Sequence, residues 1–318
     1  MTSIPGVFNI AVHVTAYQDA AALARVLNAI QVQTCAPAII RLVDNSPAPL
    51  ALPLPPAHAP ARILYQHLPA NEGTAGAINR SITWGTESGL DYLWILDQDS
   101  EPGPELLAGL VKAHQDLLKT TRIPVGLVAP LTRNRDDGQP NAPLRFDRFR
   151  SRPVFYITDP VECDFLPASG MLLHLPSLLQ LKLPNSAYFL DLYDFALGLA
   201  IKAAGAGVWV VPALELSHQV GSKVAFIKNE KTHLFADMPE SRVRLLHRNS
   251  TYLYTRSAHG FDKLLAAGWQ GRRAGLQAWR FIYYGFDQRW SKAAAALSGW
   301  ALGLFGLAPP PRNPANVK

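Results

Sequence analysis

The stretch LWILDQD, residues 93–99, decides the fold, because an apolar run ends abruptly in two carboxylates. Such a run is typical of a buried strand, and alternation along an extended chain places Asp97 and Asp99 on one side where the strand ends. Like charges held together favour a bound cation, and oxygen ligands suit Mg²⁺ or Mn²⁺. A solvated turn after a strand is the simpler interpretation of this pair taken alone.

Short apolar segments alternate with segments of helical spacing along the rest of the chain. We predict strands at residues 8–15, 39–43, 62–66, 125–129 and 208–211, and a further strand that ends at residue 97. Helices are predicted at residues 20–33, 75–85, 104–119 and 188–204. This alternation predicts an α/β fold with a parallel, doubly wound sheet.

Polar tripeptides follow three of the predicted strands. They are Thr15-Ala16-Tyr17, Asp44-Asn45-Ser46 and Asp97-Gln98-Asp99. Because ligands bind at the carboxyl ends of strands in such sheets, we expect all three tripeptides to line one binding rim. A plain loop role remains open for the first two.

The composition excludes some classes of protein. The 318 residues are 48% hydrophobic and 17% charged, which predicts a globular protein with a substantial core. A net charge of +6 favours anionic partners, and two cysteines argue against a disulfide scaffold or a cysteine zinc site. No signal peptide is recognised in residues 1–6, and the uncharged stretch 293–308 is short for a membrane span, so a cytoplasmic setting is expected.

Residues 131–153 form a basic segment with few aliphatic side chains. We predict a mobile loop, either solvated or acting as a clamp for a phosphorylated acceptor. From residue 241 onward the sequence predicts helices that are basic and aromatic.

Several motifs occur in the order found in the family 2 glycosyltransferases, and the chain resembles the bacterial rhamnosyltransferases among them. The matching segments are VHVTAY (12–17), VDNS (43–46), NEG (71–73) continuing to Asn79, LDQDS (96–100), Ser169-Gly170, FLDLYD (189–194), HQVG (218–221) and Arg248-Asn249.

The resemblance implies the GT-A fold, a Rossmann-like nucleotide-binding sheet flanked by helices, with a C-terminal helical extension. The catalytic domain would cover residues 1–240, with a nucleotide half up to about 130 and an acceptor half beyond it. Residues 241–318 would form the extension. The implied activity is inverting transfer of a sugar, L-rhamnose from dTDP-L-rhamnose, onto a polysaccharide or lipid-linked glycan. A UDP-sugar donor and a non-catalytic nucleotide-binding subunit are the alternatives.

The same resemblance assigns the donor site. Asp99 is the expected direct ligand of a divalent metal, Asp97 a second contact to the metal or the ribose, and His218 a third ligand or a phosphate donor. The implied nucleotide-sugar residues are Thr15, Ala16, Tyr17, Asp44, Asn71, Gly73, Asn79, Asp97 and Gln98, and Arg80 could reach a phosphate. Ser169 and Gly170 match the acceptor-side loop.

Asp191 is the candidate general base, and Asp194 competes for this role or supports the acceptor. Partial burial beside apolar neighbours would suit a carboxylate base. The two are three residues apart, so they would share a face on a helix; capping of a helix N-terminus is the alternative role. The chain departs from the family at Ala196 and Ala200, where relatives often carry an acid and an arginine, which bears on acceptor specificity.

The segment 272–305 interleaves aromatic and basic side chains. Such helices suit peripheral contact with an anionic membrane, here the inner face of the cytoplasmic membrane, and packing against the catalytic domain or a second subunit of a homo-oligomer is the alternative. No nucleic-acid module is recognised, so we do not expect nucleic-acid binding.

Overall fold

The computed structural model describes residues 8–51, 61–135, 137–155, 157–218, 223–228 and 231–307. The chain divides into two compact units. The sheet unit contains Met1–Arg145, Pro153–Ser186 and Tyr193–Gln219, and the helical unit contains Phe146–Arg152, Ala187–Leu192 and Val220–Lys318. The predicted boundary at residue 240 stays a prediction, and the N-terminal residues 1–7 lie outside the described part of the chain.

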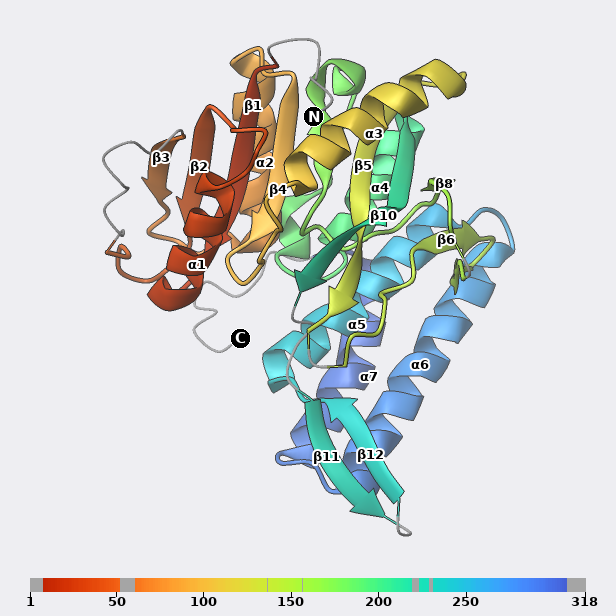
Figure 1. Ribbon diagram of the computed structural model, residues 1–318. Helices are drawn as coiled ribbons and strands as arrows, with labels where there is room; N and C mark the ends of the chain where they lie inside the picture. The colour runs from red at the N-terminus through yellow and green to blue at the C-terminus, as the bar shows by residue number, and fades with distance from the viewer. Residues whose placement is uncertain are drawn as a thin grey trace. The chain divides into compact units, whose positions relative to one another are not determined.

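A mixed sheet with the strand order β3-β2-β1-β4-β9-β5-β10-β8 forms the centre of the sheet unit (Figure 1). Its strands are β1 (Ile10–Ala16), β2 (Ile39–Asp44), β3 (Arg62–His67), β4 (Tyr92–Asp97), β5 (Val125–Asn134), β8 (Val161–Glu162), β9 (Leu172–His174) and β10 (Gly207–His218). The strands β1 to β4 run parallel, β9 is antiparallel to both its neighbours, and β10 is parallel to β5.

Four helices accompany this sheet: α1 (Ala20–Gln31), α2 (Gly73–Glu87), α3 (Leu106–Thr120) and α4 (Tyr193–Ala203). Short 3-10 turns occupy Leu175–Leu178 and Ser186–Tyr188. Strand β4 is buried from Tyr92 to Leu96, as expected of a strand covered on both faces. The α/β class and the helix-flanked, largely parallel sheet predicted from the sequence are confirmed.

The strand register brings the predicted rim together. Thr15 of β1 is aligned with Asp97 of β4, and Ala16 is aligned with Asp44 of β2. The carboxyl ends of three parallel strands therefore meet at one edge, where polar groups can leave the apolar core.

The helical unit contains three long helices, α5 (Glu240–Ser257), α6 (Asp262–Tyr284) and α7 (Arg289–Phe305) (Figure 1). Helix α7 approaches α5 closely because two glycines of α7 face α5. A Cβ on Gly299 would lie 2.4 Å from the carbonyl oxygen of Arg244, and a Cβ on Gly303 would lie 2.4 Å from that of Arg248. Helix α6 ends at Gly285, whose left-handed φ of 72° is typical of a C-terminal glycine. None of the helices in the described part of the chain has the length and hydropathy that crossing a bilayer requires.

The structure corrects the prediction of one mobile loop at residues 131–153. Strand β5 continues to Asn134, and β6 (Leu144–Asp147) pairs with β7 (Arg150–Pro153) in a two-stranded ribbon. Arginines are compatible with these strands: Arg145 and Arg152 are exposed, whereas Arg150 is half-buried. A second hairpin, β11 (Lys223–Lys228) and β12 (Lys231–Ala236), was not predicted.

Candidate functional site

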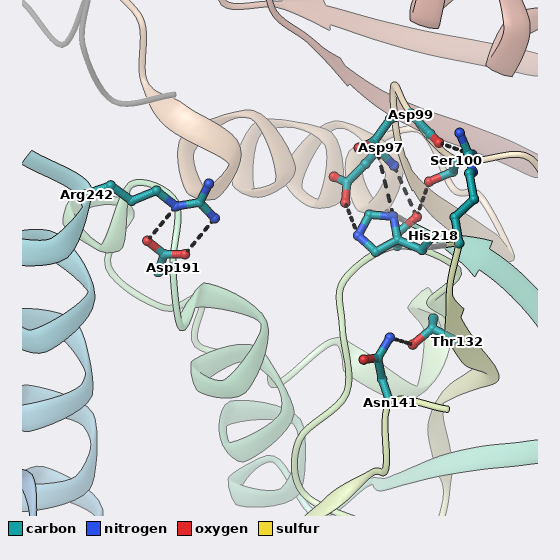
Figure 2. Close-up of polar contacts among 10 residues, drawn as sticks. Asp97, Asp99, Ser100, Thr132, Asn141, Asp191, His218 and Arg242 are labelled. Atoms are coloured by element: carbon teal, nitrogen blue, oxygen red, sulfur yellow. Dashed lines mark hydrogen bonds and ion pairs between the residues drawn. The ribbon is translucent and has the colours of Figure 1, made fainter. Parts of the chain in front are cut away.

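Two carboxylates and one imidazole converge at the carboxyl ends of β4 and β10 (Figure 2). The Nε2 atom of His218 lies 3.8 Å from Oδ2 of Asp97, and its Nδ1 atom lies 3.7 Å from Oδ1 of Asp99. One ligand atom from each of the three residues falls within 4.8 Å of the others. The structure thus brings together the three residues that the sequence predicted as metal ligands; the remainder of the HQVG motif, residues 219–221, lies outside the described residues.

Backbone pairing and a serine hold this cluster in place. Glu101 forms an antiparallel bridge with Ser217, which puts the turn after β4 beside the end of β10. The Ser169 hydroxyl accepts a hydrogen bond from the Asp97 amide at 3.3 Å and is hydrogen-bonded to the Ser100 hydroxyl. Ser169, which was predicted to lie on the acceptor side, therefore supports the turn that carries Asp97 and Asp99. Gly170 next to it has a φ of 96°, which a residue with a side chain rarely adopts.

Burial and mutual proximity set the electrostatics of this cluster. Burial, with a further contribution from the neighbouring Asp99, raises the pKa of Asp97, although the nearby His218 acts in the opposite direction. The Nδ1 atom of His218 is buried and makes no hydrogen bond within the described part of the chain. An orphaned imidazole nitrogen that faces one carboxylate, with a second carboxylate beside the same ring, fits a divalent cation, because the cation would satisfy the nitrogen and neutralise the carboxylates.

Arg135 lies beside this cluster and was not singled out by the sequence analysis. Its guanidinium donates a hydrogen bond to the backbone carbonyl of Asp99 at 2.9 Å and lies 3.3 Å from the carboxylate of Glu101. Its backbone amide donates to the carbonyl of His218 at 3.1 Å. The only sequence signal was its place in the basic segment. A fixed guanidinium next to a candidate metal site suits recognition of a phosphate group.

Gln98 holds the segment that follows β1. Its side-chain oxygen accepts from the Tyr17 amide at 2.8 Å, and its side-chain nitrogen donates to the Tyr17 carbonyl at 3.0 Å. The Thr15 hydroxyl is hydrogen-bonded to the buried His13 ring at 2.8 Å. Of the predicted nucleotide residues, Tyr17 is thereby fixed to the turn that carries Asp97 and Asp99, and Thr15 is fixed within β1.

Asp44 is buried and already accepts several hydrogen bonds. Its carboxylate accepts from the amides of Ser46 and Leu50 and from the Tyr65 hydroxyl, each at 2.8 Å. Burial acts to raise the pKa of Asp44, but these hydrogen bonds outweigh it and hold the pKa below its usual range. A carboxylate has about four acceptor positions, so the predicted contact with a nucleobase N–H stays compatible with this network.

The remaining residues predicted to bind the nucleotide sugar lie just before α2 and in its first turns. The Asn71 side chain accepts from the Gly73 amide at 2.8 Å, and Gly73 has a φ of 68°. Asn79 donates to the Pro184 carbonyl at 2.9 Å and accepts from the Tyr193 hydroxyl at 2.6 Å. Arg80 binds the Glu72 carboxylate through two hydrogen bonds, so its predicted phosphate contact competes with an ion pair.

Asp191 and Asp194 do not share a helix face, which corrects the sequence-based expectation. Helix α4 begins at Tyr193, so Asp194 lies in its first turn whereas Asp191 precedes the helix. The Asp194 carboxylate accepts from the Phe195 amide at 2.9 Å. Leu192 adopts a left-handed φ of 67°, and this breaks the helical path between the two carboxylates.

In the helical unit, Asp191 forms an ion pair with Arg242 of α5 (Figure 2). The Arg242 Nη2 and Nε atoms lie 3.1 and 3.4 Å from the two carboxylate oxygens, and the Asp191 side chain is only 14% exposed. Arg242 was missed because no motif of the sequence marked it.

Helix α4 is packed closely around Ala196, one of the two positions where the family's acid and arginine are absent, whereas Ala200 is half-buried. Ala196 is buried, and a Cβ on the neighbouring Gly198 would lie 2.1 Å from the Asp164 carbonyl oxygen. Phe195 stacks on Phe165 with ring centroids 4.5 Å apart.

The fold and the site define an α/β protein with a candidate divalent-cation centre at the carboxyl edge of its sheet. Residues 11–160 match the family model described as glycosyl transferase family 2. The matched segment, slightly less than half of the chain, resembles a family 2 glycosyltransferase domain, and the sheet and helices have the arrangement of the GT-A fold.

Solved structures agree on the fold. Staphylococcus aureus TarS 1-349 in complex with UDP-GlcNAc has a TM-score of 0.53 at 12% identity, over 90% of this chain and 79% of TarS. GalNAc-T7 with UDP, GalNAc and Mn²⁺ has a TM-score of 0.52 at 14% identity, over 80% of this chain and 51% of GalNAc-T7. A longer TarS chain, at 11% identity and a TM-score of 0.49, is covered over 39% of its length, so this chain spans about half or less of the length of two of these proteins. No curated protein sequence matches the chain significantly.

Proposed function

We propose that this protein is a metal-dependent, inverting glycosyltransferase that uses a nucleoside diphosphate sugar. The observation that carries the proposal is the convergence of Asp97, Asp99 and His218, with an orphaned imidazole nitrogen, at the rim of a family 2 domain. A divalent cation bound there would supply charge neutralisation to the diphosphate leaving group.

The protein's own residues have three tasks in this reaction. Asp97, Asp99 and His218 would hold the cation, and Arg135 beside them would bind the diphosphate. The segment Thr15–Tyr17, fixed by Gln98, would bind the nucleoside. Asp191 would accept the proton of the acceptor hydroxyl as that oxygen attacks the anomeric carbon. Arg242 occupies one acceptor position on each of its carboxylate oxygens, which leaves other lone pairs for that proton.

For the donor, we propose dTDP-L-rhamnose, with a UDP-sugar as the alternative. The Asp97-Gln98-Asp99 form of the metal motif supports rhamnosyl transfer through its resemblance to rhamnosyltransferases. The structures of TarS and GalNAc-T7 contain UDP-GlcNAc or UDP and favour the alternative.

A panel of sugar nucleotides with Mn²⁺ separates these donors, and hydrolysis to the free nucleoside diphosphate is the signal. We expect dTDP-L-rhamnose to give the highest kcat/KM. Preference for UDP-GlcNAc or another UDP-sugar would replace the rhamnosyl assignment. Nucleotide binding without hydrolysis of any donor, and without transfer to a lipid-linked acceptor, would indicate the non-catalytic subunit that the alanines at 196 and 200 also allow.

For the acceptor, we propose a lipid-linked glycan or polysaccharide reached at an anionic membrane surface, at the inner face of the cytoplasmic membrane. Exposed side chains along α6 support this: Trp279 is 52% exposed and Tyr283 39%, and their rings stack 4.6 Å apart. Arg272 and Arg280 lie on the same helix. Aromatic rings beside cations suit the headgroup region of anionic lipids.

Sedimentation with vesicles tests the membrane contact. We expect wild-type protein to bind vesicles of phosphatidylglycerol and phosphatidylcholine, and Trp279→Ala/Tyr283→Ala to bind several-fold more weakly. Ile123→Ala, an exposed apolar position of the sheet unit, is the control. Equal sedimentation of all three proteins, or a dimer that dissociates on the double substitution, would contradict the membrane proposal.

A further inference from the structure

The loop Ala187–Leu192 of the helical unit has an unusual backbone. Phe189 and Leu192 adopt left-handed φ angles of 64° and 67°, although both carry a Cβ. Such residues cost on the order of 1–3 kcal/mol each and persist only where the surrounding structure enforces them. Asp191, the proposed base, lies between the two.

Asn249 of α5 binds this loop through both hydrogens of its amide. Its Nδ2 atom donates to the carbonyl of Tyr188 and to the carbonyl of Asp191, each at 2.7 Å. The Asn249 side chain is fully buried, so these contacts face no competition from solvent.

Arg248 completes the contact. Its Nε and Nη2 atoms donate to Oδ1 of Asn249 at 3.0 and 2.8 Å, which orients the amide, and Nη2 also donates to the carbonyl of Ala187 at 2.5 Å. Three carbonyls of a six-residue loop are therefore bound by two adjacent side chains of one helix. A third residue of the same helix, Arg242, binds the carboxylate of Asp191 itself.

We infer that Arg248 and Asn249 are positioning residues, which hold the backbone of the loop in the strained conformation that presents the Asp191 carboxylate. The inference rests on the proposed function of Asp191 as base. It explains why an Arg-Asn pair distant in sequence from the FLDLYD segment belongs to the same reaction. It also explains why non-glycine residues occupy left-handed positions: the hydrogen bonds to adjacent carbonyls offset the cost of these conformations.

Asn249→Asp tests this inference because it keeps the shape and the contact with Arg248 but replaces the amide donor by an acceptor. The two carbonyls of Tyr188 and Asp191 would then face a carboxylate oxygen. Ser250→Ala is the matched control: Ser250 is buried one residue further along α5, and its hydroxyl donates to the carbonyl of His247 at 3.3 Å.

Loop conformation is measured first, by hydrogen exchange at the Leu190 amide, which donates to the Tyr188 carbonyl at 2.8 Å. We expect exchange at least about tenfold faster in Asn249→Asp than in wild-type or Ser250→Ala protein. Unchanged exchange in a folded Asn249→Asp protein would overturn the inference whatever the activity shows.

Turnover of dTDP-L-rhamnose with Mn²⁺, or of UDP-GlcNAc if the donor panel favours it, is measured second. A displaced base predicts a kcat lower by roughly 10–100-fold with the donor KM within twofold of wild type. In an Asp191→Asn background the same substitution should change the residual kcat by less than twofold, because its effect passes through Asp191. An equal loss in both backgrounds would overturn the positioning role.

Arg248→Lys provides a second route if Asn249→Asp fails to fold. It keeps the charge but loses the fork that orients Asn249, so we expect a smaller loss of kcat with the same dependence on Asp191. Full turnover by Asp191→Asn would instead refute the base assignment of the proposed function. The Leu190 exchange measurement distinguishes this failure from a failure of the positioning role of Arg248 and Asn249.

Discussion

The imidazole of His218 faces Asp99 without hydrogen-bonding to it: Nδ1 of His218 lies 3.7 Å from Oδ1 of Asp99. This separation exceeds the usual N–H···O distance, and the buried nitrogen has no other partner in the described residues. Side chains that converge without direct contact are expected where a cation joins them.

We therefore expect Asp99→Asn to lose Mn²⁺. The substitution preserves shape and removes the charge of one ligand. Affinity for Mn²⁺, measured by isothermal titration, should fall by at least about 100-fold, beyond the roughly 10–100-fold that loss of an outer-shell partner costs. Asp116→Asn, which removes a surface carboxylate paired with Lys112 and Lys119 on α3, is the control and should leave the affinity unchanged. Equal Mn²⁺ binding by both variants would rule out the metal assignment.

The two candidate bases are separable by substitution. Asp191→Asn should lower kcat by about 10²–10⁴-fold, the usual contribution of a general base, and leave nucleotide affinity unchanged. Asp194→Asn should cost less than about tenfold, because its carboxylate binds the Phe195 amide in the first turn of α4 and the amide oxygen can do the same. Steady-state donor turnover measures both. A larger loss for Asp194→Asn would transfer the base role to that residue.

The sequence predicted the rim well, because parallel strands align their ends by a general rule. Asp97 and Asp99 come at the end of an apolar run whose burial is confirmed. His218 was assigned through the family resemblance alone, because the strand predicted at 208–211 stops short of it; in the structure it is the last residue of β10. The position of Asp191 could not be predicted in this way. A helical path through Asp191 and Asp194 was the default, and Leu192 breaks it with a conformation that side chains rarely adopt. The partners of Arg242 and Arg135 could not be predicted, because an arginine carries no local signal of the group it binds, whether it stands alone or in a basic segment.

Close packing of α4 leads to a prediction about stability. In Gly198→Ala, the added Cβ would lie 2.1 Å from the Asp164 carbonyl oxygen, so backbone must move. We expect the free energy of unfolding to fall by about 1–3 kcal/mol, as for other overpacked positions. Gly268→Ala in α6, where a Cβ meets nothing within 4 Å, should instead raise it by up to about 1 kcal/mol through helix propensity. Urea unfolding of both variants checks the contrast. Equal stability of the two would contradict the packing observed around Gly198.

Buried neutral histidines should make the protein sensitive to mild acid. Burial, together with the positive charge of Arg41, lowers the pKa of His13 to about 3, and burial lowers the pKa of His114 and His247 to about 4. In the unfolded chain these rings have the ordinary pKa of about 6.5, so between the two values the unfolded state binds more protons. The free energy of unfolding should therefore decrease as pH falls below about 6.5, by about 1.4 kcal/mol per pH unit for each such histidine.

His13→Gln isolates one of these contributions. The ring of His13 is fully buried and bonds Ser81 at 2.7 Å, so the substitution lowers stability at every pH, but the slope against pH is the measured quantity. Urea unfolding between pH 7 and pH 4.5 should give a pH slope shallower than wild type, with a difference that approaches about 1.4 kcal/mol per pH unit below about pH 5.5. His259→Gln, at an exposed position, is the control. A wild-type slope in His13→Gln would mean that the His13 ring is charged in the folded protein, which would contradict its place beside Arg41 in the centre of the sheet.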